Sequence, residues 1–176
     1  KQSETDQMTG LANRYRLNDY SDKVLDYCYE HRLPLAMEIL DIDFFKQYND
    51  NYGHQQGDEC IIAIADELKK MEDGQTFCAR YGGDEFIIIY AGISVEEVHA
   101  KAGALRQNIM NLKLEHLYSK ALPIVTISQG ISYGVPEEGN RSWDFLHTAD
   151  MLLYQVKKRS RNDICIADIR GQELDL

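Results

Sequence analysis

Arg80-Tyr81-Gly82-Gly83-Asp84-Glu85-Phe86 is the stretch of sequence on which the expected fold depends. Apolar residues precede it at 77–79, and an unbroken run of β-formers, 86–90, follows it. Two such runs joined at a glycine pair predict a β-hairpin, because tight hairpin turns need the positive φ that glycine adopts at little cost. We therefore expect a hairpin whose turn is built around Gly82 and Gly83.

Two carboxylates, Asp84 and Glu85, follow this glycine pair directly. Neighbouring strand residues point to opposite faces of a sheet, so the two side chains are expected to serve different neighbours. Carboxylates at a hairpin tip, beside glycines that let another molecule approach, favour a site for a metal and phosphate. Taken alone, the stretch fits an ordinary polar turn equally well.

The composition is that of one globular domain. A chain of 176 residues, 44% hydrophobic and 27% charged, is long enough to bury a core. Its formal net charge of −10 argues against a nucleic-acid or anionic-membrane surface, since both require a basic footprint. A small phosphate ligand stays compatible with this charge, because a divalent metal and a few local cations can offset it.

The cysteines and the chain start indicate the cellular setting. The four cysteines are widely spaced and form no metal-binding or redox motif, so we expect reduced core residues in a cytoplasmic domain. No signal peptide or membrane-spanning run is present. Because the chain does not begin with methionine, we expect it to be a fragment of a longer protein, whose missing part could include a sensor. Any membrane anchor would lie in the missing N-terminal part.

Hydrophobic periodicity and chain-breaking residues predict ten elements in the order α-β-α-α-β-β-α-β-α-β. We expect Ile61, Ile62, Ala65 and Leu68 to face the core from the third helix. Outside the hairpin, the expected elements are a helix capped by Asn13 and ending near His31, a strand at 35–42, a short helix at 45–51, a glycine-containing loop at 52–58, helices at 59–71 and 95–112, a strand at 123–133, a helix capped by Ser142, and a strand at 163–167.

This order predicts an α+β fold with a ferredoxin-like βαββαβ core. We expect about five strands, antiparallel pairing at the centre, helices on one face with further helices added, and an additional C-terminal strand. In such a sheet the first strand lies centrally beside the second hairpin strand. That arrangement would bring Asp41, at the end of the first strand, within reach of Asp84.

The acidic residues at these strand ends suggest a magnesium site. Two carboxylates, a carbonyl oxygen and phosphate oxygens form the ligand set that Mg²⁺ prefers, and such sites carry out phosphoryl and nucleotidyl transfer. Acids at strand ends are also commonly solvated or salt-bridged. For Asp43, two residues after Asp41, we favour that structural role, as the partner of a nearby base.

Cations and amides that could bind a nucleotide lie elsewhere in the chain. Lys157 and Arg161 are four residues apart near a helix end, where they would share a face and could contact phosphates, or could simply complement the helix dipole. Asn49 and Asp58 flank a glycine-containing loop, and an amide beside a carboxylate suits the edge of guanine. His54 by itself is more typical of a structural hydrogen bond than of catalysis.

Together these residues resemble the GGDEF family of diguanylate cyclases, which condense two GTP into cyclic di-GMP. The resemblance runs from Asp6 to Ile166, so we treat 1–176 as a single GGDEF domain with its core at about 6–167. It implies that the chain is the C-terminal catalytic fragment of a larger sensor protein. It rests on five motifs in order: Asp6-x-x-Thr9-Gly10-Leu11-x-Asn13-Arg14, Asp41-Ile42-Asp43-x-Phe45-Lys46, Asn49-Asp50-x-x-Gly53-His54-x-x-Gly57-Asp58, the hairpin stretch, and Lys157-x-x-x-Arg161-Asn162.

The resemblance implies a polymerase-palm type fold and a role for each motif. Mg²⁺, or alternatively Mn²⁺, would be bound by Asp41, the Ile42 carbonyl, Asp84 and Glu85, and Glu85 could also deprotonate the attacking hydroxyl. The remaining implied roles are guanine binding by Asn49 and Asp58 with His54 nearby, and phosphate binding by Lys157, Arg161 and the backbone N–H groups near Phe44 and Phe45.

The resemblance also implies partners and leaves alternatives. Each domain would supply half a site, so GTP and a second copy of the domain are the expected partners, and the monomer should be inactive. The family's RxxD product-inhibition motif is absent, since Asp73 and Thr76 stand at its ends. A catalytically silent module that binds GTP or cyclic di-GMP and regulates a partner is one alternative, and a cyclase for another purine is a second.

Overall fold

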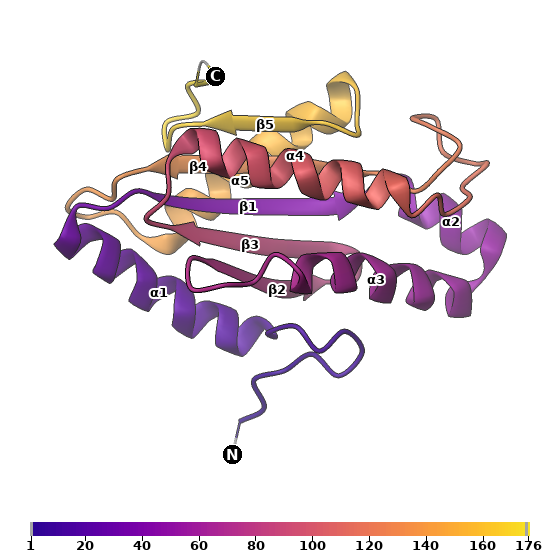
Figure 1. Ribbon diagram of the computed structural model, residues 1–176, viewed down its shortest axis with the longest axis horizontal. Coiled ribbons are helices and arrows are strands. Elements are labelled where there is room, and N and C mark those ends of the chain that lie inside the picture. Colours follow the sequence, from indigo (N-terminus) through magenta and orange to yellow (C-terminus); the bar gives the residue numbers. More distant parts are fainter. Residues whose placement is uncertain (1, 175) are drawn as a thin grey trace.

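The computed structural model, which describes residues 2–174 and 176, places the first strand of the chain at the centre of a five-stranded sheet (Figure 1). The strand order is β2-β3-β1-β4-β5, in which β1 is antiparallel to both β3 and β4, and β5 is parallel to β4. This is the ferredoxin-like βαββαβ order with one strand added at the C-terminal edge, as predicted. The strands are β1 (Leu35–Ile42), β2 (Thr76–Gly82), β3 (Glu85–Ala91), β4 (Ile127–Gly134) and β5 (Ile164–Ala167).

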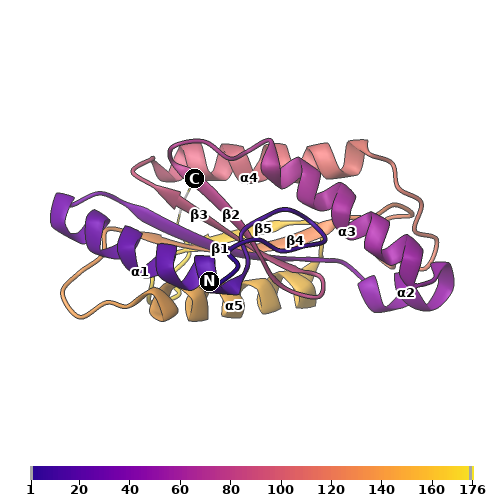
Figure 2. The same ribbon diagram turned by 90° about the horizontal axis from the view of Figure 1, so that it is seen from below.

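Helices cover both faces of the sheet. Figure 2 shows α3 and α4 on one side and α1 and α5 on the other. The two helices of the βαββαβ core therefore share one face, as expected, and the additions cover the opposite face. The helices are α1 (Arg14–His31), α2 (Phe45–Tyr52), α3 (His54–Lys69), α4 (Val95–Asn111) and α5 (Ser142–Arg159).

Each face of the sheet has its own hydrophobic core, which explains why all eight residues of β1 are buried. Leu40 and Ile42 pack in the cluster beneath α3 and α4, whereas Met37 and Ile39 pack in the cluster beneath α1 and α5. The four cysteines are buried and free, in agreement with their predicted place in the core. Across the described part of the chain, no helix has the length and apolar character needed to cross a membrane.

A glycine fixes the close approach of α5 to the sheet. A Cβ on Gly130, in β4, would lie 3.0 Å from the carbonyl carbon of Leu152 and closer still to backbone atoms of Ala149 and Leu153. Any other residue would push the helix away from β4. The seating of α5 determines where Lys157, near its C-terminal end, meets the sheet.

The third helix begins five residues earlier than predicted. It starts at His54, so the loop expected at 52–58 reduces to Gly53, whose φ of 90° and ψ of 160° separate α2 from α3. Glycine suits that backbone conformation because it has no side chain to clash. Ile62 was expected in the core but is 36% exposed, because Ile61, Ile64 and Leu68 form the buried stripe.

Two further boundaries differ from the predictions. β4 begins at Ile127 because the residues before it pair instead with the segment after α4, through Val125 N–H to Leu114 O at 2.8 Å. Ser142 is the first residue of α5 rather than its cap. Its hydroxyl donates to Asp22 on α1, and the N-cap is Arg141, whose backbone N–H donates to the Asp144 carboxylate.

The predicted hairpin is confirmed, but the reason given for its glycines was wrong. The turn consists of Gly83 and Asp84, between the end of β2 and the start of β3. Neither Gly82 nor Gly83 has a positive φ. The chain reverses with the help of a register shift between Arg80 and Gly82, a bulge that leaves Tyr81 without a partner on β3.

Candidate active site

Asp41, the seventh residue of β1, lies next to the hairpin carboxylates. Its register partner on β3 is Glu85, and its partner on β4 is Ser128. Because β1 and β3 are antiparallel, the C-terminal end of β1 meets the start of β3, where Asp84 and Glu85 lie. The sheet order thus brings together the three carboxylates that the sequence analysis assigned to one site.

The environment of Asp41 penalises its charge. The residue as a whole is only 5% exposed, and burial raises its pKa to about 7. The ammonium of Lys157, which contacts Asp41 Oδ2, acts in the opposite direction, while the charges of Asp84 and Asp43 raise the pKa further. Asp41 Oδ1 is buried without a hydrogen-bond partner. A buried carboxylate oxygen left free in this way is suited to a cation.

The two hairpin carboxylates are half-buried. Burial raises the pKa of Asp84, and it raises the pKa of Glu85, to which the charge of Asp84 adds. No group of three or more His, Cys, Asp or Glu side chains in the described residues could by itself hold a metal ion. The free Oδ1 of Asp41 beside Asp84 nevertheless fits Mg²⁺, because this metal uses one or two carboxylates and completes its shell with phosphates and water.

Asp43 has the structural role that was favoured for it. It is fully buried and accepts hydrogen bonds from Thr126 Oγ1 at 2.7 Å, Ser128 Oγ at 2.6 Å and the backbone N–H of Asn162 at 3.0 Å. The guanidinium of Arg161 also lies near this carboxylate, with Nη1 3.7 Å from Asp43 Oδ1. Asp43 therefore holds the chain that follows α5 against the end of β1.

The two predicted phosphate-binding cations reach the end of β1 by different routes. Lys157 projects from α5, but Arg161 lies beyond its C-cap, Ser160, so the two do not share a helix face as expected. Arg161 has a φ of 54°, and its guanidinium carbon lies 4.1 Å from the centre of the Phe44 ring. Both cations are thereby directed to β1, where they face Asp41 and Asp43.

Phe44 and Phe45 form the entry to α2. Phe44 is the N-cap residue, with a left-handed φ of 54° and ψ of 38° and no side-chain capping bond. The first backbone N–H groups of a helix lack partners within it and attract anions. The start of α2 thus lies beside Arg161, and both features are of the kind that attracts anions.

Asn49 and Gly57 fit together where α2 meets α3. A Cβ on Gly57 would collide with Asn49 Oδ1 and would lie 2.9 Å from its Cγ. Asn49 Oδ1 is buried without a hydrogen-bond partner. Asp58 follows Gly57 and is exposed on the first turns of α3, as is His54. The structure therefore packs the predicted amide against Gly57, the residue before the predicted carboxylate.

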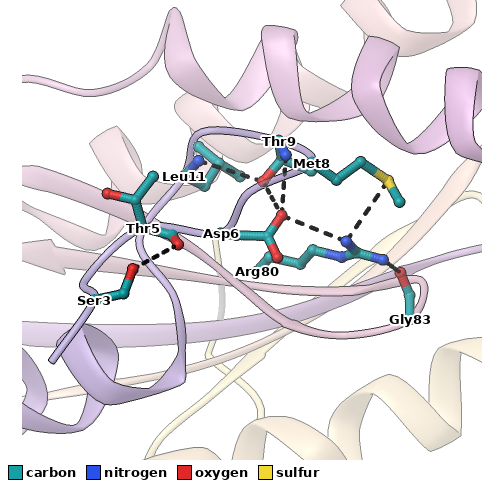
Figure 3. Close-up of polar contacts among 8 residues, drawn as sticks. All are labelled: Ser3, Thr5, Asp6, Met8, Thr9, Leu11, Arg80 and Gly83. Carbon is teal, nitrogen blue, oxygen red and sulfur yellow. Dashed lines mark hydrogen bonds and ion pairs between the residues drawn. The ribbon is translucent and has the colours of Figure 1, made fainter.

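A contact that the sequence analysis did not assign connects the N-terminal loop to the hairpin. Arg80 donates from Nη2 to the Gly83 carbonyl at 2.8 Å and from Nη1 to Asp6 Oδ2 at 3.4 Å, and Thr9 donates to the same Asp6 oxygen (Figure 3). Arg14 adds a second link, from Nε to the Tyr81 carbonyl at 2.8 Å. The only signal in the sequence was the Asp6-x-x-Thr9 motif, whose contact lies 74 residues away.

Comparisons with known proteins agree with this geometry. The family described as "Diguanylate cyclase, GGDEF domain" matches residues 3–163. The chain is 34% identical over 163 residues to the probable diguanylate cyclase DgcC of Escherichia coli, covering 91% of this chain and 42% of that protein. It is 31% identical over 160 residues to the response regulator PleD of Caulobacter vibrioides, covering 91% and 35%. The chain therefore spans less than half the length of these curated relatives.

Solved structures show the same fold. The GGDEF domain of DgcB from Caulobacter crescentus, in complex with cyclic di-GMP, superposes with a TM-score of 0.85 at 29% identity, covering 94% of each chain. The active GGEEF domain of a diguanylate cyclase from Vibrio cholerae has a TM-score of 0.76 at 30% identity, covering 89% of this chain and 97% of that one.

Proposed function

Since the chain belongs to the GGDEF family of diguanylate cyclases, we propose that it condenses two GTP molecules into cyclic di-GMP and two pyrophosphates. One observation carries the proposal: Asp41 is buried with a free oxygen, beside the hairpin carboxylates and in contact with Lys157. Such an arrangement has no evident structural use, because the desolvation of the carboxylates costs stability. It is suited to a metal and a polyphosphate.

The proposed reaction is nucleotidyl transfer. The 3′-hydroxyl of one GTP attacks the α-phosphorus of the other, a new O–P bond forms, and the bond to the pyrophosphate oxygen breaks. The hydroxyl proton goes to a base, and the step is repeated in the opposite direction to close the ring. Glu85 is the proposed base, because its half-buried carboxylate lies at the start of β3, where it is the register partner of Asp41.

The metal would be held by Asp41, the Ile42 carbonyl, Asp84 and Glu85. When bound, Mg²⁺ or Mn²⁺ polarises the phosphate and favours ionisation of the hydroxyl. The cations of this chain have their own task. Lys157 and Arg161, with the N–H groups at Phe44 and Phe45, would bind the terminal phosphates and orient the α-phosphorus for in-line attack.

Guanine would bind where α2 meets α3. Asp58 would accept hydrogen bonds from the ring N–H and the exocyclic amine, with Asn49 beside it and His54 nearby. The free Oδ1 of Asn49 supports this assignment, since a buried acceptor without a partner costs free energy until a donor arrives. Each domain would bind one GTP, so two domains would have to meet in antiparallel orientation for catalysis.

The proposal is tested by one assay. The domain is fused to a dimeric coiled coil and incubated with GTP and Mg²⁺, and cyclic di-GMP is quantified by chromatography. Asp84→Ala should abolish product while the thermal unfolding midpoint stays close to that of wild type, because Asp84 lies in a turn and is only half-buried. GTP binding without product would favour a regulatory module, and unfolding of the variant would contradict the placement of Asp84 in the metal site.

A further inference from the structure

Three residues other than glycine have left-handed backbone conformations at the proposed phosphate site. They are Phe44, with a φ of 54°, and the consecutive Arg161 and Asn162, with φ values of 54° and 47°. This conformation is unfavourable for residues with a Cβ, and most of all for a bulky one such as Phe44. Backbone strain of this kind persists only where the surroundings hold it, and it is concentrated at functional sites.

The Phe44 backbone is held by a histidine from outside the site. His116 Nε2 lies 2.9 Å from the Phe44 carbonyl oxygen, and because a carbonyl only accepts, Nε2 must carry the proton. His116 is fully buried in the irregular segment after α4, and its ring meets the Tyr48 ring edge-on at 5.2 Å. The Phe44 carbonyl also accepts from Tyr48 N–H at 3.0 Å, so two donors fix its direction.

The Arg161–Asn162 backbone is held from α4. Arg106 Nε donates to the Asn162 carbonyl at 2.6 Å, and the Asn162 amide nitrogen Nδ2 contacts the sulfur of Met110 at 3.3 Å. The backbone N–H of Asn162 donates to Asp43. Arg106 is half-buried beside a cavity of about 470 Å³ that Arg161 and Asn162 also line.

The two strained segments meet where the Arg161 guanidinium lies over the Phe44 ring, with its carbon 4.1 Å from the ring centre. His116 therefore supports the Phe44 side of this contact, and Arg106 supports the Arg161 side. We propose that His116 and Arg106 are positioning residues, which hold the backbone N–H groups at the start of α2 and the Arg161 side chain ready for the phosphates. The inference rests on the proposed function for the identity of the ligand, and neither residue is proposed to contact it.

Matched substitutions separate this role from simple packing. His116→Phe keeps an aromatic ring and removes the donor, whereas His116→Gln keeps a donor close to Nε2. Arg106→Met removes the guanidinium and keeps the aliphatic stem, whereas Arg106→Lys keeps a donor. The controls are His99→Phe and Arg170→Met at exposed positions. The probes are inorganic pyrophosphate with Mg²⁺ and 3′-deoxy-GTP, which cannot condense, both titrated by calorimetry.

We expect His116→Phe and Arg106→Met each to weaken pyrophosphate binding about tenfold, the effect of one lost hydrogen bond to a strained backbone group. The Gln and Lys variants should recover most of that affinity, and the controls should bind as wild type does. In the dimerised enzyme, KM for GTP should rise more than kcat falls, since guanine contacts and carboxylates are untouched.

The outcomes are distinguishable. Equal affinity in wild type, His116→Phe and Arg106→Met would overturn the inference, as would equal losses in the Phe and Gln variants. Wild-type binding of pyrophosphate without cyclic di-GMP synthesis would refute the proposed function and leave the positioning role to be judged by the binding series. No pyrophosphate binding by wild type would refute both. If His116→Phe fails to fold, Arg106→Met and its Lys partner carry the test.

Discussion

The Nζ of Lys157, on α5, contacts the Oδ2 of Asp41, at the end of β1, so a proposed phosphate ligand and a proposed metal ligand neutralise each other in the free protein. Both side chains are poorly exposed, with 30% and 7% of their surfaces accessible. Burial raises the pKa of Asp41 to about 7, and the Lys157 ammonium limits that rise. Binding of metal and nucleotide would replace this contact with two separate ones.

Lys157→Met should therefore weaken GTP binding by about tenfold or more, since one charge-assisted hydrogen bond to phosphate is lost. The same variant removes the cation beside Asp41, so the pKa of Asp41 should rise and the pH at which activity appears should move upward. Steady-state kinetics across a pH series measures both effects. Lys158→Met is the matched control, because Lys158 is exposed and its ammonium lies over the Tyr154 ring.

Gly57→Ala should impair GTP binding although alanine favours helix. The new Cβ would occupy the position of Asn49 Oδ1 and displace the amide from the proposed guanine site. We expect KM for GTP to rise about tenfold, as for loss of one or two hydrogen bonds. Gly103→Ala in α4 is the control, because nothing lies within 4 Å of its added Cβ, and it should gain up to about 1 kcal/mol from helix propensity alone. Unchanged KM in Gly57→Ala would argue against Asn49 as a guanine ligand.

The link between the N-terminal loop and the hairpin should matter more for activity than for stability. Arg80→Met removes the bonds to the Gly83 carbonyl and to Asp6, at a cost of about 1–2 kcal/mol in the free energy of unfolding. With the turn less fixed, cyclic di-GMP synthesis should fall by a larger factor. Hydrogen exchange at 83–85 should accelerate, and exchange in β1 should not change. Faster exchange throughout the sheet would instead indicate a general loss of stability.

The buried Glu38 should make the stability of the domain depend on pH. Its side chain is fully buried in β1, Oε1 accepts from Tyr90 Oη at 2.7 Å, and Oε2 has no hydrogen-bond partner. Burial raises its pKa from 4.5 to about 8. Between these values the native state keeps a proton that the unfolded state releases. The free energy of unfolding should therefore decrease as pH rises, by about 1.4 kcal/mol per pH unit from this group.

Glu38→Gln should remove the contribution of Glu38 to that slope, because an amide has no proton to lose. Urea unfolding should give similar stabilities for the two proteins near the lower pKa and a more stable variant near the upper one. The two titratable groups that face Glu38 also have raised pKa values, so both stay protonated across this pH range. Burial raises the pKa of Tyr90, and burial also raises that of Cys78, with the charge of Glu38 adding to both. A wild-type stability that does not fall across this range would show that Glu38 is solvated or paired in solution.

The product should not inhibit the enzyme through the segment before β2. Lys101 Nζ donates to Asp73 Oδ2 at 3.1 Å and to Thr76 Oγ1 at 2.9 Å. The two residues that stand at the ends of the family motif are therefore both bound to one lysine of the same chain. Adding cyclic di-GMP in excess over the enzyme should leave the initial rate of GTP consumption unchanged. Inhibition that is lost in Asp73→Ala would overturn this prediction.

Much of the fold could be predicted from local sequence. The order of all ten elements and the central position of β1 agree with the structure. Hydrophobic periodicity indicates which face of a helix is buried, but two consecutive apolar residues cannot both lie on that face. Ile61 is buried, and the neighbouring Ile62 is exposed. The start of α3 was misplaced because Gly57 signals a loop in sequence, whereas in the structure it is the helical position against which Asn49 packs.

The sequence by itself indicated which carboxylates, amides and cations to expect in the candidate site, because the motifs that resemble the GGDEF family are short local stretches that can be recognised without the fold. Only the tertiary structure decided how they are held. The contact of Lys157 with Asp41, the bond from Asn162 to Asp43 beside Arg161, and the support from His116 and Arg106 join residues that are 56 to 119 positions apart. Such contacts depend on how helices pack across the sheet, which no short stretch of sequence specifies. The hairpin itself was predicted correctly from its glycine pair, but for the wrong physical reason, because neither glycine has a positive φ.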